Sequence, residues 1–153
     1  MPSSAHLQSP HIIPMPTAKP RSGFRTFAFY HLPAILYAAL IFAVSSIPQL
    51  RVPSFKLENI DKLIHFVEYS IFAYLIFRSF SKIQLLTRGH LAPLIAILFV
   101  SLYAASDEYH QRFVAGRDSS VSDLAADVLG AVLVILYVHL RTRRLARSQS
   151  HPT

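Results

Sequence analysis

The sequence predicts an all-α protein, an integral membrane four-helix bundle with both termini cytoplasmic. Two observations support this prediction. Hydrophobic residues make up 52% of the chain and charged residues only 15%, against about 25% charged in an ordinary soluble domain. The charges also sort by sign between four apolar stretches. Because Lys and Arg stay on the cytoplasmic side of a membrane, this sorting indicates a chain that crosses one several times.

The sign pattern determines the expected orientation. Ten of the fifteen basic residues lie in the N-terminal region, the second turn and the C-terminal region: Lys19, Arg21, Arg25, Arg78, Lys82, Arg88, Arg141, Arg143, Arg144 and Arg147. All acidic residues lie around the first and third turns: Glu58, Asp61, Glu68, Asp107, Glu108, Asp118, Asp123 and Asp127. The protein is therefore expected in the cell membrane with its acidic face outside and its termini in the cytoplasm.

The first span is expected over Phe27–Ile47, inside a stretch from Thr26 to Leu50 that has no formal charge. About 20 residues rising about 1.5 Å each cross a hydrocarbon core of about 30 Å. Pro33 lies in the first turns of this helix, where a missing N–H does least harm. A basic region before an apolar run also resembles a signal peptide with a cleavage site at 43–45, but this run is long for a signal core.

Three further spans are expected over Ile60–Phe80, Leu91–Ala105 and Val121–Leu140. The second and fourth carry polar residues, as the helices of a soluble bundle also would. A soluble bundle would leave the uncharged first stretch exposed to water, so the membrane interpretation is favoured. The spans define a transmembrane domain over residues 26–141. It lies between a proline-rich tail at 1–25, expected to be disordered and cytoplasmic, and a basic cytoplasmic tail at 142–153.

Composition also bears on the partners. The chain has no cysteine, which excludes disulfide and thiolate chemistry. The net charge of +7 would suit nucleic acid, but no basic stripe alternates with exposed aromatic residues, so no nucleic-acid partner is expected. The basic flanks instead suit anionic head groups, which makes membrane lipids the expected partners. The oligomeric state is left open.

Helical spacing is expected to gather polar residues at the outer end of the bundle, because residues four apart share a helix face. The rows come from the second helix, the end of the third and the start of the fourth: Asp61, His65, Glu68 and Tyr69; Tyr103, Asp107, Glu108 and Gln111; Asp123 and Asp127. A carboxylate near mid-bilayer is costly, so the deeper acids Glu68 and Asp127 must face protein or water.

Three arrangements would relieve the repulsion among these acids. Basic partners would pair with them, the candidates being Lys62, His65, Arg112 and Arg117. Some of the acids would take up protons. Alternatively, a divalent cation would bridge the oxygens, although no cofactor is established by the sequence. The candidate metal ligands are Asp61, Glu108, Asp123 and Asp127.

The third turn is expected to present a cationic side chain to this cluster. Gly116 permits the positive φ of a tight turn. Arg117 beside it offers a planar donor fork suited to phosphate or carboxylate, with simple pairing to Asp118 or Asp123 as the alternative. Ser120 or Ser122 is expected to cap the fourth helix.

Several segments resemble signatures of the VanZ-like family. They are residues 61–69, the run Asp107-Glu108 through His110-Gln111, Phe113 and Gly116-Arg117, then Asp123, Asp127 and Gly130, and Ser45-Ser46-Ile47-Pro48. The resemblance covers about residues 27–140. The sequence departs from the pattern at Ala115, where proline is common, and at Asp127, where asparagine is frequent. The family's name member is associated with low-level resistance to the glycopeptide antibiotic teicoplanin. By resemblance, nine residues form a ligand-binding site: Asp61, Lys62, His65, Tyr69, Glu108, Gln111, Arg117, Asp123 and Asp127.

The sequence favours binding at the outer face to the head group of an envelope lipid or glycolipid. A lipid-modifying hydrolase or transferase is the alternative, with His65, Glu68, Glu108 and Asp123 as catalytic candidates. The common hydrolase and nucleotide-binding motifs are absent from the sequence, so enzyme activity is left undecided. A purely structural polar network and a proton-coupled carrier are the other interpretations.

Overall fold

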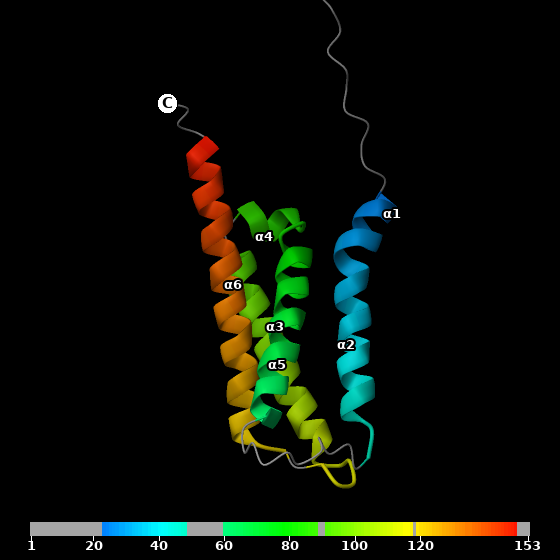
Figure 1. The fold of residues 1–153 in the computed structure, drawn as a ribbon. Coiled ribbons are helices and arrows are strands. Elements are labelled where there is room, and N and C mark those ends of the chain that lie inside the picture. Colours follow the sequence, from blue (N-terminus) through cyan, green and yellow to red (C-terminus); the bar gives the residue numbers. More distant parts are fainter. Residues whose placement is uncertain (1–22, 49–59, 89–90, 118, 150–153) are drawn as a thin grey trace, which may run out of the picture.

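A computed structural model describes residues 23–48, 60–88, 91–117 and 119–149. Within these ranges the chain is helical and has no strand. The elements are α1 (Gly23–Thr26), the π-helical turn η1 (Phe27–His31), α2 (Leu32–Ser45), α3 (Ile60–Phe80), α4 (Gln84–Arg88), α5 (Ala92–Gln111) and α6 (Val121–Gln149) (Figure 1). The expectations for the N-terminal tail at residues 1–22, for the turn at residues 49–59 and for residues 150–153 concern residues outside the described ranges.

Four helical segments in the described ranges are long and apolar enough to cross a membrane: Gly23–Ser45, Ile60–Phe80, Ala92–Gln111 and Val121–Gln149. They confirm the predicted all-α membrane bundle. Large apolar side chains such as Leu36, Leu98 and Leu133 are exposed. Because lipid tails are themselves apolar, such exposure suits a surface that faces the hydrocarbon core.

Helix α3 packs against the three other spanning segments, and most extensively against α6 (Figure 1). Small residues allow this close packing, as is common between membrane helices. Gly130 of α6 lies directly against α3, since a Cβ at this position would stand 2.5 Å from the Phe66 carbonyl oxygen and 2.7 Å from Ser70 Oγ. Around this contact, Ala73 and Ala131 are fully buried.

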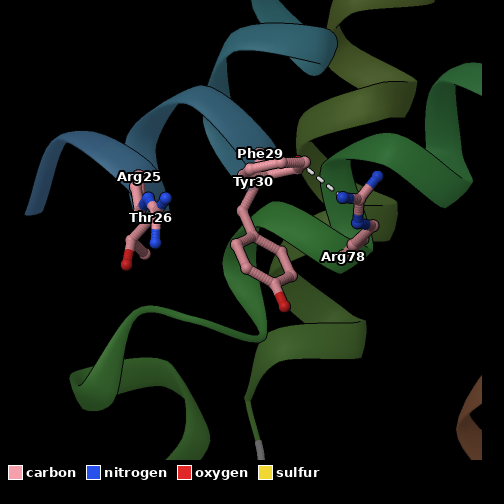
Figure 2. Close-up of a pocket in the computed structure, with 5 residues that line it drawn as sticks. All are labelled: Arg25, Thr26, Phe29, Tyr30 and Arg78. Carbon is pink, nitrogen blue, oxygen red and sulfur yellow. Dashed lines mark hydrogen bonds between the residues drawn. The ribbon is translucent and has the colours of Figure 1, made fainter. Parts of the chain in front are cut away.

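The first span contains a π-helical turn that is followed by Pro33. Pro33 has no N–H to donate to the Phe29 carbonyl, four residues earlier. The N–H of Leu32 bonds the Phe27 carbonyl, five residues earlier. A guanidinium nitrogen of Arg78, from α3, donates to the Phe29 carbonyl instead (Figure 2). The proline therefore leaves an acceptor that ties the first span to α3.

Three helix boundaries differ from the prediction by four residues or more. The first helical segment begins at Gly23 instead of Phe27, so residues 23–25 of the expected tail are helical. Helix α5 runs past the predicted end at residue 105 to Gln111, and α6 runs past residue 140 to Gln149. Both helix ends were predicted too early because the prediction followed only the apolar residues. Polar residues continue α5 because they are buried and bonded, and the Arg, Leu and Ala residues of α6 are good helix formers.

The two ends of the bundle differ in charge. The start of the first span, α4 and the end of α6 lie at one end (Figure 1). The ends of α2 and α5 and the starts of α3 and α6 lie at the other, which we call the acidic end. All six carboxylates in the described ranges lie at or near the acidic end, whereas Arg25, Arg78 and Lys82 lie at the opposite one. The predicted segregation of charge between the two ends is thus present in these residues.

Candidate functional site

The acidic end contains buried carboxylates from two helices. Asp107 and Glu108 of α5 are each 5% exposed, and Asp123 and Asp127 of α6 are 4% and 1% exposed. Charged side chains this deep in a protein are rare unless each oxygen has a partner. The hydrogen-bond partners of each carboxylate oxygen therefore indicate which oxygens have a structural role and which are available to a ligand.

Helices α3 and α6 join through two pairs of side chains. His65 Nδ1 donates to Asp127 Oδ1 at 3.1 Å, in the buried part of the helix interface. One turn nearer the bundle end, Lys62 Nζ lies 3.3 Å from Asp123 Oδ1 and is 39% exposed. The second oxygen of Asp127, Oδ2, is buried and has no hydrogen-bond partner among the described residues. The described residues therefore provide a hydrogen-bond partner for only one of the two oxygens of Asp127.

Asp107, in contrast, has a partner for each oxygen. Its Oδ1 accepts from Ser45 Oγ at 2.6 Å, and its Oδ2 accepts from Gln111 Nε2 at 3.0 Å. A second contact at 3.0 Å joins Ser46 Oγ to His110 Nε2. These contacts attach the end of α2 to the end of α5, so the Asp107 carboxylate has a structural role.

Glu108 orients the start of α6. Its Oε2 accepts the backbone N–H of Ser120 at 2.9 Å, and Ser120 Oγ in turn accepts the N–H of Ser122 at 3.1 Å. Ser120 is therefore the cap of α6, in agreement with one of the two predicted caps. The remaining oxygen, Glu108 Oε1, is buried without a partner in the described part of the chain.

The turn after α5 brings Arg117 back to α2. Gly116 has φ of 79°, which confirms the predicted left-handed turn. Arg117 Nη2 donates to the Val44 carbonyl at 2.8 Å, near the end of α2, and the same carbonyl accepts the N–H of Ile47 at 3.2 Å. Arg117 Nε is buried and unbonded by any described residue. Of the two alternative partners predicted for Arg117, Asp123 pairs with Lys62 instead, and Asp118 lies outside the described residues.

A cavity of about 80 Å³ opens between the first span, α3, α5 and the Arg117 turn. It accommodates a few water molecules or one small polar group. Its lining is formed by Ile41, Val44, Ser45, Asp61, Ile64, His65, Glu68, Asp107, Gln111 and Arg117. Asp61 is exposed at the start of α3. Tyr69, two turns further along the same helix, has a buried hydroxyl without a hydrogen-bond partner in the described ranges.

Two groups of side chains at the acidic end have the spacing of a metal site. They are Asp61, His65 and Asp123, and His65, Glu108 and Asp127, each with its ligand atoms within 4.8 Å of one another. All four metal candidates taken from the sequence occur in these groups. His65 belongs to both, and the sequence prediction did not include it among the metal ligands.

The opposite end of the bundle has a larger groove of different character. It measures about 460 Å³ and is lined by Arg25, Thr26, Phe29, Tyr30 and Arg78 (Figure 2). The Arg78 guanidinium lies 4.9 Å from the centre of the Tyr30 ring, and Lys82 Nζ lies 4.5 Å from it. The described residues that line this groove include no carboxylate, so its charge is opposite in sign to that of the acidic end.

The structure brings the nine predicted site residues to the acidic end. Arg112 was predicted as a further partner for the acidic residues. Its side chain is exposed and lies over the Tyr109 ring instead. Sequence reasoning missed Ser45 as a partner of Asp107 and the Val44 carbonyl as the acceptor for Arg117. The sequence contained one signal for this region, because residues 45–48 were part of the family resemblance.

The fold and the site together define a small multi-pass membrane protein with a buried polar site at one end of a helical bundle. A family model described as VanZ/LLP1 matches residues 9–142. The match spans most of the chain, and the protein therefore belongs to the VanZ-like family. No curated protein and no solved structure matches the chain.

Proposed function

We propose that the acidic end binds the head group of an envelope lipid or glycolipid from the outer leaflet. The observation that supports this most is the set of buried polar atoms without partners in the described ranges: Tyr69 Oη, Glu108 Oε1, Arg117 Nε and Asp127 Oδ2. Each such atom destabilises a fold by about 1–3 kcal/mol. A network that served only to hold the helices together would be expected to satisfy its members.

The position of the cavity favours an amphiphile over a soluble ligand. The cavity lies beside helices whose outer faces are apolar, and Ile41, Val44 and Ile64 form part of its lining. Ile64 is 42% exposed, so apolar surface continues from the cavity along the outside of α3. A head group in the cavity would leave its acyl or prenyl chain along this surface, where the hydrophobic effect favours it.

Arg117 is the side chain best suited to recognise the head group. It lines the cavity, and its planar fork binds phosphate or carboxylate oxygens through paired hydrogen bonds. One of its nitrogens, Nη2, donates to the Val44 carbonyl, and this hydrogen bond orients the side chain. Control of an envelope lipid or glycolipid in this way would be consistent with the glycopeptide resistance associated with the family's name member.

A lipid-modifying hydrolase or transferase is the second candidate, and the arrangement of His65 favours it. His65 lines the cavity beside Glu68 and is oriented from behind by Asp127, as a general base is oriented by a third group. The two functions separate by the fate of the lipid. A binding protein returns the bound lipid unchanged, whereas an enzyme converts it to a product of different mass.

Lipid retention by an Arg117→Ala variant tests the proposal. The wild-type protein, extracted gently, is expected to retain one class of phosphorylated or glycosylated lipid. Hydrogen bonds to a charged group contribute about 1.5–3 kcal/mol, so retention by Arg117→Ala should fall by about tenfold or more. Mass spectrometry of the co-purified lipids provides the measurement. Arg112→Ala, which removes an exposed arginine nearby, is the matched control and should retain the lipid. The same lipid profile in all three proteins would contradict the proposal.

The proposed orientation places the acidic end outside and the basic end in the cytoplasm. Since the chain has no native cysteine, single cysteines report their side of the membrane directly. Ser119→Cys is expected to react with an impermeant thiol reagent in intact cells. Ser81→Cys, at the opposite end, should react only after the membrane is permeabilised. The reversed labelling pattern would show that the acidic end faces the cytoplasm.

A further inference from the structure

We infer that His65, Glu108 and Asp127 bind a divalent transition-metal cation. This inference rests on the proposed function and deepens it, because a cation would supply the positive centre that an acidic cavity needs to accept a phosphate. The three ligands come from α3, α5 and α6, so the ion would also join these helices. The argument depends on the geometry, on the unpartnered oxygens and on the balance of charge.

The geometry already resembles a coordination site. The ligand atoms of the three side chains lie within 4.8 Å of one another. His65 Nδ1 and Asp127 Oδ1 are 3.1 Å apart, and two neighbouring ligands each about 2.1 Å from one metal ion are separated by roughly 3–3.4 Å. This pair therefore has the spacing of two ligands of one ion, and the Glu108 ligand atom lies within 4.8 Å of both.

Two carboxylate oxygens among the three proposed ligands make no hydrogen bond to a described residue. Glu108 Oε1 and Asp127 Oδ2 are buried without hydrogen-bond partners in the described ranges. The other oxygen of Glu108 is fixed by the N–H of Ser120, the residue that caps α6. Backbone contacts of this kind orient ligating carboxylates in metal sites. The protein thus holds the carboxylate from one side and leaves its other oxygen unbonded.

The balance of charge also calls for a cation. The described residues of the acidic end include six carboxylates, four of them buried. Among the described residues, two Lys or Arg side chains reach the site: Lys62, which pairs with Asp123, and Arg117, which lines the cavity. Buried carboxylates repel one another strongly at low dielectric. The set that includes Asp61 and Asp123 is less suitable, because Lys62 already balances Asp123 and Asp61 is exposed.

The donor atoms select the class of metal. An imidazole nitrogen with two carboxylates suits Zn²⁺ or Mn²⁺ better than Ca²⁺ or Mg²⁺, which prefer oxygen ligands alone. Binding through His65 Nδ1 would require the proton that now bonds Asp127 to leave this nitrogen. A neutral ring would carry its proton on Nε2 instead, and a protonated ring would release one proton to solvent, so that the Nδ1 lone pair coordinates the ion. The ion would then offer an open position to a phosphate oxygen of the head group.

Metal content in two neighbouring variants of α5 tests the inference. Glu108→Gln removes a proposed ligand. Asp107→Asn makes a similar change one residue earlier, in a side chain that is equally buried but has both oxygens bonded. The full-length proteins are purified in detergent, stripped with a chelator, reloaded with Zn²⁺ or Mn²⁺ and measured by elemental mass spectrometry. His65→Gln provides a second ligand-loss variant, and only monodisperse, helical samples are compared.

About one metal equivalent per chain is expected in the wild type and in Asp107→Asn. A fall of tenfold or more is expected in Glu108→Gln and His65→Gln. Saturating metal should raise the melting temperature of the wild type by roughly 5–10 °C and leave that of Glu108→Gln unchanged. Equal metal in Glu108→Gln and the wild type, or none in any reloaded protein, would overturn the inference.

Lipid retention measured on the same samples separates the two proposals. If the wild type binds no metal but retains a lipid that Arg117→Ala loses, the metal site is contradicted and the proposed function is supported. Stoichiometric metal that requires Glu108, in a protein that retains no lipid, would support the metal site and contradict head-group binding.

Discussion

His65→Leu is expected to destabilise the protein by about 3–5 kcal/mol, because it leaves the Asp127 carboxylate buried without its partner. Asp127 is 1% exposed, and its contact with His65 at 3.1 Å is its one hydrogen bond to a described side chain. The free energy of unfolding, measured by titrating a denaturing detergent into folded micelles, reports the loss. A change below about 1 kcal/mol would mean that the pair does not exist as the structure shows it.

Adding Asp127→Leu to His65→Leu is expected to restore most of this stability. Replacing both members of a buried polar pair by apolar residues of similar size is often neutral or stabilising. If the double variant is instead as unstable as the single one, the pair holds the helices together in a way that apolar packing cannot replace. This comparison therefore separates a pair kept for stability from a pair kept for binding.

Gly130→Ala is expected to destabilise the protein by about 3 kcal/mol or more, since overpacking a tight contact typically costs 1–3 kcal/mol and this one involves backbone. The new methyl group would lie 2.5 Å from the Phe66 carbonyl oxygen, so α3 and α6 must move apart. His65 is the neighbour of Phe66 and bonds Asp127 across the same interface. The substitution should therefore also reduce lipid retention.

Gly23→Ala is the matched control for this prediction. Both glycines lie in helices, but a Cβ at Gly23 would have nothing within 4 Å. Alanine is the better helix former by about 1 kcal/mol, so Gly23→Ala should be neutral or slightly stabilising in the same unfolding titration. Equal stability of the two variants would show that the close approach at Gly130 does not constrain the fold.

The sequence was sufficient to predict the four spans because each depends on local composition. Long apolar stretches with few or no charges, and charges sorted by sign between them, identify the helices without any knowledge of their packing. Helix ends were predicted less well. The end of α5 was placed at residue 105, whereas the helix continues through Asp107 and Glu108 to Gln111. A hydropathy pattern assigns such residues to a loop, and only their tertiary partners keep them in a buried helix.

The candidate site could be predicted as a set of residues but not as a set of contacts. Helical spacing placed Asp61, His65 and Glu68 on one face, and all three line the cavity. The bonds that position the site join distant residues, such as Ser45 to Asp107 and Arg117 to the Val44 carbonyl. Such contacts depend on how the helices pack against one another, which no local pattern specifies.

The distinction between Asp107 and Glu108 shows what the structure adds. The two residues are adjacent, equally buried and identical in charge. Asp107 has both oxygens bonded by side chains of α2 and α5, whereas Glu108 has one oxygen bonded and one without a partner in the described ranges. A structural role suits the first residue and a ligand suits the second.

Lipid retention by the folded His65→Leu, Asp127→Leu double variant tests the central claim most directly, because it removes site chemistry while keeping the helix interface filled. The measurement is the amount of co-purified lipid per chain, compared with the wild type by mass spectrometry. Head-group binding at the acidic end predicts a stable double variant that has lost most of the lipid. A stable double variant that retains the wild-type amount of the same lipid would contradict the claim and place the binding surface elsewhere on the bundle.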